Sequence, residues 1–175
     1  MKTLEQAKSE GVLENEIYNA DCLEIMKLLP DKCVDLVLTD PPYNLKKGFQ
    51  NDNLSEKEFI NWSKKWLLEF KRILKDDGSL YFFGSIKNNC FLKLKLWLDS
   101  KMIFRNWITW HKKTRMQTGK NNYVNQREEI LYYVNSDKFK FKNPRGVKYE
   151  TLPLNNEFSE FLLKDKLPYN ENKIN

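Results

Sequence analysis

The residues of this sequence best suited to chemistry form one short segment, Asp40-Pro41-Pro42-Tyr43, called here the DPPY segment. Asp40 supplies a carboxylate that accepts hydrogen bonds, and Pro41 offers a carbonyl oxygen but no N–H group. Pro42 stiffens the turn, and Tyr43 presents a flat ring close to the carboxylate. Two acceptors beside a ring suit the exocyclic NH₂ group of a heteroaromatic base, so we predict that these four residues are catalytic.

A base within a duplex cannot reach such a site, so the target nucleotide must be flipped out and stacked on an aromatic ring. Unstacking costs a few kcal/mol, and stacking on a ring such as that of Tyr43 returns about 1–3 kcal/mol. No nucleophilic cysteine or metal-binding cluster accompanies the segment in the sequence. Direct attack by the amino nitrogen on an electrophile is therefore favoured over catalysis through a covalent enzyme intermediate. The competing interpretation is an ordinary Pro-Pro turn after a strand.

The elements that must position this segment alternate between strands and helices. Residues 34–40 read VDLVLTD, a short apolar run typical of a parallel strand buried on both faces. The patterns that follow predict a capped helix over 55–75, a strand over 79–84, a helix over 88–101, strands over 102–110 and 128–134, and a hairpin partner over 138–142. This order predicts an α/β fold with a mostly parallel sheet and helices on both faces. Ligands bind outside the carboxyl ends of such strands, where the DPPY segment stands.

Composition narrows the class of protein. The 175 residues are 41% hydrophobic, which is enough for one domain with a core, and the net charge of +6 favours polyanionic partners. The three cysteines show no C-x-x-C pairing, so neither disulfides nor a metal site are predicted and a reduced, cytoplasmic setting is favoured. No apolar stretch reaches the roughly 20 residues of a membrane span, and no signal peptide is recognisable.

A basic segment follows the third strand. Residues 111–127 contain five Lys or Arg residues and one histidine but no acid, in a chain with 24 acids. Such a run is too polar for a core element and predicts an exposed loop. We interpret it as a DNA-binding loop, with an ordinary solvated loop as the alternative.

Several segments together resemble a known family. EIYNADCLEIMKLLPDKCVDLVLTDPPYNL, LLEFKRILKDDGSLYFFG, NWITWHKK and NNYVNQREEILYYV follow one another in this order. In this they are similar to the N-terminal half of a DNA adenine N6-methyltransferase of restriction-modification type. The resemblance covers residues 16–143. It implies a Rossmann-like, S-adenosyl-L-methionine (AdoMet)-dependent enzyme that methylates the N6 amino group of adenine in duplex DNA, with a cognate restriction endonuclease as a possible partner.

The resemblance also assigns residues. Asp40 and the Pro41 carbonyl would orient the amino group, and Tyr43 would stack on the flipped adenine. Asp21 matches a position near the cofactor, so Asp21, Asp40 and Pro41 are the cofactor-binding residues that the resemblance implies; a helix N-cap is the alternative role for Asp21. Phosphate and base contacts are expected from Lys46, Lys47, His111, Lys112, Lys113, Arg115, Lys120, Asn122, Asn125, Gln126 and Arg127.

The chain departs from the family in its glycines. Members with this motif order carry a late F-x-G-x-G segment that binds AdoMet, whereas none of the six glycines here forms G-x-G. We therefore expect a polar N-terminal segment (1–15), a partial catalytic domain (16–143) and an irregular tail (144–175). The chain would then be a truncated gene product, a fragment, or one half of a split enzyme whose other half, with F-x-G-x-G, is a second polypeptide. One alternative function is that of a catalytically silent DNA-binding remnant. A second is cytosine-N4 methylation, although enzymes of that type more often have serine at the position of Asp40. A third is methylation of RNA or of a protein amide.

Overall fold

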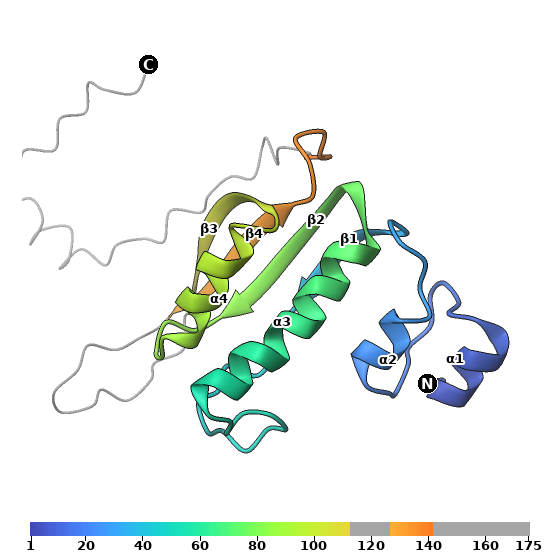
Figure 1. Ribbon diagram of the computed structural model, residues 1–175, viewed down its shortest axis with the longest axis horizontal. Helices are drawn as coiled ribbons and strands as arrows, with labels where there is room; N and C mark the ends of the chain where they lie inside the picture. The colour runs from blue at the N-terminus through green and yellow to red at the C-terminus, as the bar shows by residue number, and fades with distance from the viewer. Residues whose placement is uncertain (113–126, 142–175) are drawn as a thin grey trace, which may run out of the picture. The chain divides into compact units, whose positions relative to one another are not determined.

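The computed structural model describes residues 1–112 and 127–141 of the chain (Figure 1). Residues Met1–Lys140 form one compact unit. The elements follow in the order α1 (Leu4–Glu10), α2 (Cys22–Met26), β1 (Val34–Thr39), α3 (Glu56–Ile73), β2 (Leu74–Gly84), α4 (Cys90–Leu98), β3 (Ile103–His111) and β4 (Arg127–Val134). The predicted order of strands and helices between residues 34 and 134 is confirmed. No helix among the described residues is both long and apolar enough to cross a membrane.

The predicted strand over 138–142 is wrong in its described part, because residues 138–141 form no strand. Instead the chain turns back toward the start of β2. The backbone N–H of Lys140 donates to the carbonyl oxygen of Asp77 at 3.2 Å, and the Ser136 hydroxyl donates to that of Asp76 at 2.7 Å. These bonds compete with the ladder that a hairpin strand would need.

The four strands form one sheet in the order β1-β2-β4-β3. β1 and β2 are parallel neighbours, whereas β4 is antiparallel to both β2 and β3. β1, β2 and β3 therefore run in the same direction, as predicted for strands joined by helical crossovers. The expected mostly parallel pairing is nevertheless corrected to a mixed sheet, because β4 returns from β3 and inserts beside β2. An antiparallel return needs no helical crossover, so the strand alternation could not reveal it.

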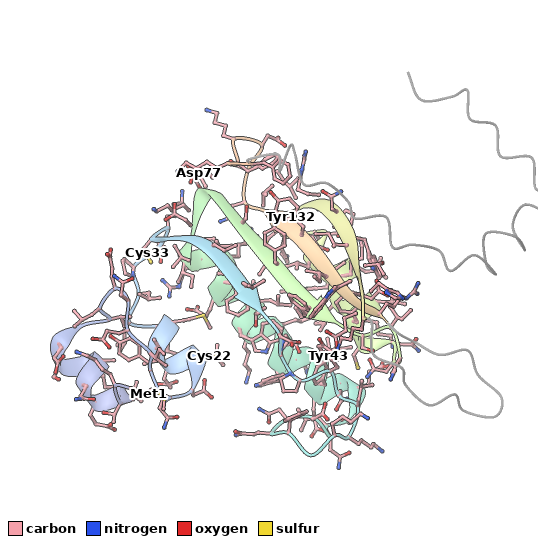
Figure 2. All side chains as sticks on the ribbon, turned by 180° about the vertical axis from the view of Figure 1, so that it is seen from behind. Met1, Cys22, Cys33, Tyr43, Asp77 and Tyr132 are labelled. Atoms are coloured by element: carbon pink, nitrogen blue, oxygen red, sulfur yellow. The ribbon has the colours of Figure 1, made fainter. Side chains whose placement is uncertain are left out.

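Helices α3 and α4 both cover one side of the sheet, here called the inner face (Figure 1). Figure 2 shows the opposite side, the outer face, and no helix of the described part of the chain lies over its strands. The sequence predicted helices on both faces. The two crossovers β1-α3-β2 and β2-α4-β3 progress in the same direction along the sheet, and crossovers of one hand then place both helices on one face. Helices on the outer face would require strands beyond β1.

The inner face holds the core. Helix α3 begins with a capping box, in which the Ser55 side chain accepts from the Glu58 backbone N–H and the Glu58 side chain accepts from that of Ser55. Trp66 of α3 packs against Phe70 and, from β2, Phe82, with ring centroids 5.4 and 5.6 Å apart. The aromatic stripe of residues 59–74 is therefore core packing, as predicted.

Gly84 ends β2 where the strand meets α4. A Cβ atom added to Gly84 would lie 2.0 Å from Cδ2 of Phe91, a buried ring that also contacts Phe82 and Trp107. We expect Gly84→Ala to lower the free energy of unfolding by about 1–3 kcal/mol, because the Phe91 ring must leave its packed position. Chemical denaturation measures this loss. In a Phe91→Leu background the same substitution should cost less, and an unchanged cost would contradict this packing argument.

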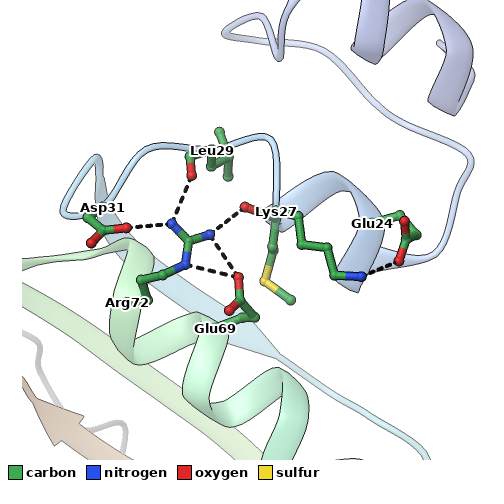
Figure 3. A network of polar contacts seen from close by, with 7 residues as sticks. Glu24, Lys27, Leu29, Asp31, Glu69 and Arg72 are labelled. Carbon is green, nitrogen blue, oxygen red and sulfur yellow. Dashed lines mark hydrogen bonds and ion pairs between the residues drawn. The ribbon is translucent and has the colours of Figure 1, made fainter.

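Arg72, near the end of α3, ties the end of α2 and the loop before β1 to α3 (Figure 3). Its guanidinium donates to the carbonyl oxygens of Met26 and Leu29 at 2.7 and 2.9 Å. It also pairs with the carboxylates of Glu69 and Asp31, each at 2.7 Å. These bonds hold the segment that enters β1, so they set the position from which the strand runs toward the DPPY segment.

Candidate active site

The DPPY segment follows the carboxyl end of β1, where Thr39 pairs with Phe82 of β2. Tyr43 lies at the opposite end of the sheet from Cys33, which precedes β1 (Figure 2). A cavity of about 460 Å³ opens at this end. Besides the DPPY residues, it is lined by Leu45, Lys47, Phe49, Gln50, Asp52 and Glu128. The volume lies in the range of pockets for small ligands.

Asp40 and Tyr43 are joined directly. The Tyr43 hydroxyl donates to Oδ1 of Asp40 at 2.5 Å. Burial raises the pKa of Tyr43 well above its usual range, and the hydrogen bond to the Asp40 carboxylate raises it further. The phenol therefore remains protonated, remains a donor, and holds the carboxylate in one orientation. The predicted proximity of ring and carboxylate is present.

Two acceptors remain available at the cavity. Oδ1 of Asp40 is engaged by Tyr43, while Oδ2 has no hydrogen bond to any residue of the described part of the chain. The carbonyl oxygen of Pro41 likewise accepts no hydrogen bond from residues 1–112 or 127–141. An amino group with two hydrogens could donate one to each. The local chemistry is thus that of an acceptor pair next to an aromatic ring.

Two asparagines hold the backbone after Tyr43. The Asn88 side-chain amide, from the loop between β2 and α4, donates to the carbonyl oxygens of Tyr43 and Asn44 at 2.8 and 3.1 Å. The Asn44 side chain forms a reciprocal pair with the backbone of Leu54, at 2.9 and 3.0 Å. Asn44 itself has a positive φ of 59°, a region that asparagine tolerates better than most residues. These bonds anchor the DPPY segment to the start of α4.

Asp52 organises the loop that forms one wall of the cavity. Asp52 is only 1% exposed. Its carboxylate accepts hydrogen bonds from the backbone N–H of Leu45, at 2.9 Å, and from that of Lys47. The Asp52 carbonyl accepts from Lys46 at 2.9 Å, and the Asp52 N–H donates to the carbonyl oxygen of Phe49 at 3.2 Å. We call residues 44–54 the Asp52 loop. Its backbone is fixed by internal hydrogen bonds rather than by a packed apolar core.

Charged residues at the ends of β3 and β4 adjoin the cavity. Glu128, which lines it, forms an ion pair with Lys112, and Arg127 pairs with the buried Glu129 at 2.8 Å. Glu129 also accepts from the indole N–H of Trp107 at 2.5 Å. Among the residues that the structure describes, no group of three or more His, Cys, Asp or Glu side chains could hold a metal ion.

Comparison with known proteins decides the family. The model of the DNA methylase family (N6 and N4 methyltransferases) matches residues 34–174, more than half of the chain. The chain belongs to the DNA methylase family. The resemblance to DNA methyltransferases of restriction-modification type is thereby confirmed.

Two relatives illustrate the match. The type II methyltransferase M.BamHI of Bacillus amyloliquefaciens is 37% identical over 141 residues, which are 79% of this chain and 33% of that protein. The DNA adenine methyltransferase YhdJ of Escherichia coli (strain K12) is 32% identical over 124 residues, covering 70% of this chain and 42% of that protein. This member of the DNA methylase family therefore spans between a third and a half of the length of these relatives.

Solved structures share the fold. The PvuII DNA methyltransferase (cytosine-N4-specific) has a TM-score of 0.59 at 17% identity, over 72% of this chain and 50% of that one. The M1.HpyAVI-SAM complex has a TM-score of 0.54 at 24% identity, over 77% of this chain and 62% of that one. The predicted Rossmann-like α/β class is confirmed.

The other site residues named from the sequence are distributed as follows. The Asp21 side chain accepts from the backbone N–H of Leu23 at 2.8 Å and caps α2, and Asp21 is not among the residues that line the cavity. Lys46 and Lys47 are exposed on the Asp52 loop, and His111 is exposed at the end of β3. Lys113, Arg115, Lys120, Asn122, Asn125 and Gln126 lie outside the described residues.

Several residues at this site were not singled out from the sequence, and they include the cavity-lining Leu45, Phe49 and Gln50. Asp52 and Asn88 position the loop, and Glu128 lines the cavity from β4. Polar residues in loops are common, and their partners here lie on other segments, so local spacing carries no signal for Asn88 or Glu128. For Asp52, the run NDN beside a polar loop is compatible with a turn but does not indicate burial.

The protonation of Tyr43 can be tested together with Tyr133, whose buried hydroxyl donates to Asp99 at 2.7 Å and whose pKa is also raised by burial. Both pKa values lie above the ordinary value of about 10, so the folded state retains protons that the unfolded state loses. These two phenols therefore contribute stability that is present below about pH 10 and lost as the pH rises further.

An alkaline titration followed by tyrosinate absorbance measures which tyrosines ionise near pH 10 and which ionise only when the protein unfolds. In the double variant Tyr43→Phe and Tyr133→Phe, the transition near pH 10 should keep its amplitude, and only the late phase that accompanies unfolding should shrink. A smaller early phase would show that one of these phenols titrates as an exposed tyrosine.

Proposed function

We propose that this chain provides the base-binding half of a DNA methyltransferase that transfers a methyl group from AdoMet to the N6 amino group of a flipped adenine. The observation that carries the proposal is the acceptor pair, Asp40 Oδ2 and the Pro41 carbonyl oxygen, beside the Tyr43 ring in one cavity. Each acceptor takes one hydrogen of the NH₂ group, which increases electron density on the nitrogen. The Tyr43 ring stacks on the base and offsets the cost of unstacking it.

The assignment to adenine rests on Asp40 and on the similarity to the adenine methyltransferase from Escherichia coli. The likeness to the cytosine-N4 enzyme, at 17% identity, supports the fold alone. Cytosine also carries an exocyclic amino group, so the acceptor pair does not exclude it. A carboxylate at position 40, rather than serine, favours adenine.

AdoMet would supply the methyl group, but the described residues do not fit it on their own. Close approach of backbone to such a cofactor needs glycine, and no glycine lines the cavity. Gly84 is packed under Phe91, and Gly48 borders open space. Asp40 and Pro41 line the cavity that a methyl donor would have to reach, whereas Asp21 acts as the N-cap of α2. The cofactor's main cradle is therefore assigned to residues outside this part of the chain.

A second polypeptide segment is proposed to supply that cradle by docking on β1. Within the described residues β1 pairs only with β2, so its other edge is open. Leu36 and Leu38 alternate with the core residue Val37 and project from the outer face, 53% and 65% exposed. A parallel strand is normally covered on both faces, and its exposed apolar edge tends to pair with another strand. The occupant is a strand parallel to β1 with a helix over these leucines, from the part of the family that carries F-x-G-x-G.

Leu38→Lys tests this docking surface. We expect about tenfold weaker association with a co-expressed polypeptide that carries the glycine-rich part of the family, because a lysine would be buried there without a partner. Leu96→Lys is the matched control, because Leu96 is 70% exposed on α4. Equal effects of the two substitutions, or release of a dimer of this chain by Leu38→Lys alone, would contradict the proposed occupant.

The function itself is tested by methyl transfer to duplex DNA. The full chain, the glycine-rich polypeptide and labelled AdoMet are incubated with DNA, and the methylated nucleosides are identified by mass spectrometry. N6-methyladenine is expected. N4-methylcytosine alone would overturn the substrate assignment, and no product from an assembled complex would overturn the enzymatic proposal. Recovery of this chain with a restriction endonuclease of the same specificity would extend it to a restriction-modification pair in the cytoplasm.

A catalytically silent DNA-binding protein is the second candidate, favoured by the lack of a glycine cradle among the described residues. It would use the exposed Lys46 and Lys47 on DNA phosphates, with affinity falling steeply as salt rises. Calorimetry distinguishes the two candidates. AdoMet binding by the assembled complex supports the enzyme, and DNA binding without AdoMet binding supports the silent protein.

A further inference from the structure

Phe49 is an exposed aromatic residue at the candidate active site. It is 68% exposed, although a phenylalanine of this size is usually buried. It lines the same cavity as Asp40, Pro41 and Tyr43. No ring contact joins Phe49 to Tyr43 or to another aromatic residue within the described parts of the chain. Nothing in the packing of the core accounts for an aromatic side chain here.

The position of Phe49 is fixed by its backbone. Its carbonyl oxygen accepts from the N–H of Asp52 at 3.2 Å, and the buried Asp52 carboxylate holds Leu45 and Lys47 on the preceding stretch. The ring is therefore displayed from an ordered loop whose other end continues directly into the DPPY segment. An ordered loop loses little entropy when its side chain binds a ligand, which favours a binding role.

The chemistry around Phe49 suits a nucleotide. Lys46 and Lys47 precede it and are exposed, so they can meet a phosphate, while the acceptors of the DPPY segment lie across the same cavity. An aromatic ring offers a stacking surface to any base, whatever the nucleotide sequence of the strand. A second ring in the cavity offers the base a stacking surface in addition to Tyr43.

We infer that Phe49 is a second aromatic contact for the flipped base. The base enters the cavity between Phe49 and Tyr43, while Asp40 and Pro41 hold its amino group. This rests on the proposed function, because it assumes that the cavity receives a base. It adds a base-binding residue from the Asp52 loop, outside the DPPY segment. Phe49 binds and positions the base and takes no part in proton or methyl transfer.

The test uses the full chain and a short single-stranded oligonucleotide with one 2-aminopurine in place of adenine, since an unpaired base needs no recognition sequence to reach the cavity. Stacking on aromatic rings quenches the fluorescence of 2-aminopurine. We expect Phe49→Leu to weaken binding about tenfold and to reduce the quenching, whereas Phe49→Tyr retains both. Phe104→Leu, at a residue 37% exposed on β3, is the matched control and should bind as the unmodified chain does.

The outcomes separate this inference from the proposed function. Unchanged affinity and quenching in Phe49→Leu, with both lost in Tyr43→Leu, would overturn the role of Phe49 and leave the base-binding cavity in place. Absence of quenching by the unmodified chain would overturn the inference. The proposed function is judged separately by methyl transfer, because 2-aminopurine carries its amino group at C2 and lacks the N6 amino group that Asp40 and Pro41 would hold.

Discussion

Asp40→Asn is expected to lower methyl transfer to DNA at least about 100-fold in the assembled complex, a loss typical of removing one preorganised polar group from an active site. The substitution preserves the size of the side chain. An asparagine oxygen can still accept from Tyr43, as Oδ1 of Asp40 does at 2.5 Å. Its NH₂ group, however, replaces Oδ2 and presents hydrogens to an amino group that needs an acceptor. The rate of label transfer from AdoMet to duplex DNA measures the effect.

Asp35→Asn is the matched control for this prediction. Asp35 lies on the same strand, but its side chain is 64% exposed and pairs with Lys75 at 2.7 Å, away from the cavity. An exposed ion pair contributes about 0–1 kcal/mol, so neither folding nor transfer should change appreciably. Retention of full activity by Asp40→Asn in a folded protein would remove Asp40 from the proposed mechanism.

Asp52→Ala is expected to lower the free energy of unfolding by about 2–4 kcal/mol, because it leaves two backbone N–H groups without their acceptor. These groups belong to Leu45 and Lys47, and the Asp52 side chain that they contact is buried. Loss of the carboxylate should also release the Asp52 loop and with it Phe49. Chemical denaturation measures the stability, and hydrogen exchange of residues 44–54 measures the order of the loop.

The controls for Asp52 separate burial from charge. Asp76→Ala removes a carboxylate whose side chain is 67% exposed and paired with Lys32 at 2.9 Å, so it should cost at most about 1 kcal/mol. Asp52→Asn keeps one acceptor oxygen and should fall between the two alanine variants. Equal stability of Asp52→Ala and Asp76→Ala would show that the hydrogen bonds to the loop backbone add nothing to the fold.

The strands and helices between residues 34 and 134 were predictable because their signals are local. The capping box at Ser55 and the aromatic spacing along α3 identify that helix from consecutive residues. The neighbours of each strand depend instead on which segments meet in space. Leu80 of β2 pairs with Tyr133 of β4, across more than fifty residues, and no local pattern in either segment specifies that partner.

The same limit explains the site. The DPPY segment was recognisable because its four residues are adjacent and their chemistry can be read together. Asn88 reaches Tyr43 across 45 positions and Glu128 enters the cavity from β4, so both were found only once the chain was folded. Two of the predicted DNA-contacting residues, Lys112 and Arg127, form ion pairs with Glu128 and Glu129 where β3 ends and β4 begins. The composition of the basic segment did not predict these ion pairs.

The sequence by itself determined the acceptor chemistry of Asp40 to Tyr43, the alternation of strands and helices, and the absence of a G-x-G segment, because each depends on residues close together in the chain. Only the tertiary structure decided that β4 lies beside β2, that both large helices share one face, and that the Asp52 loop brings Phe49 to the DPPY segment. Those features depend on pairing and burial between distant segments. Such contacts form only when loop closure and packing act together over the whole domain.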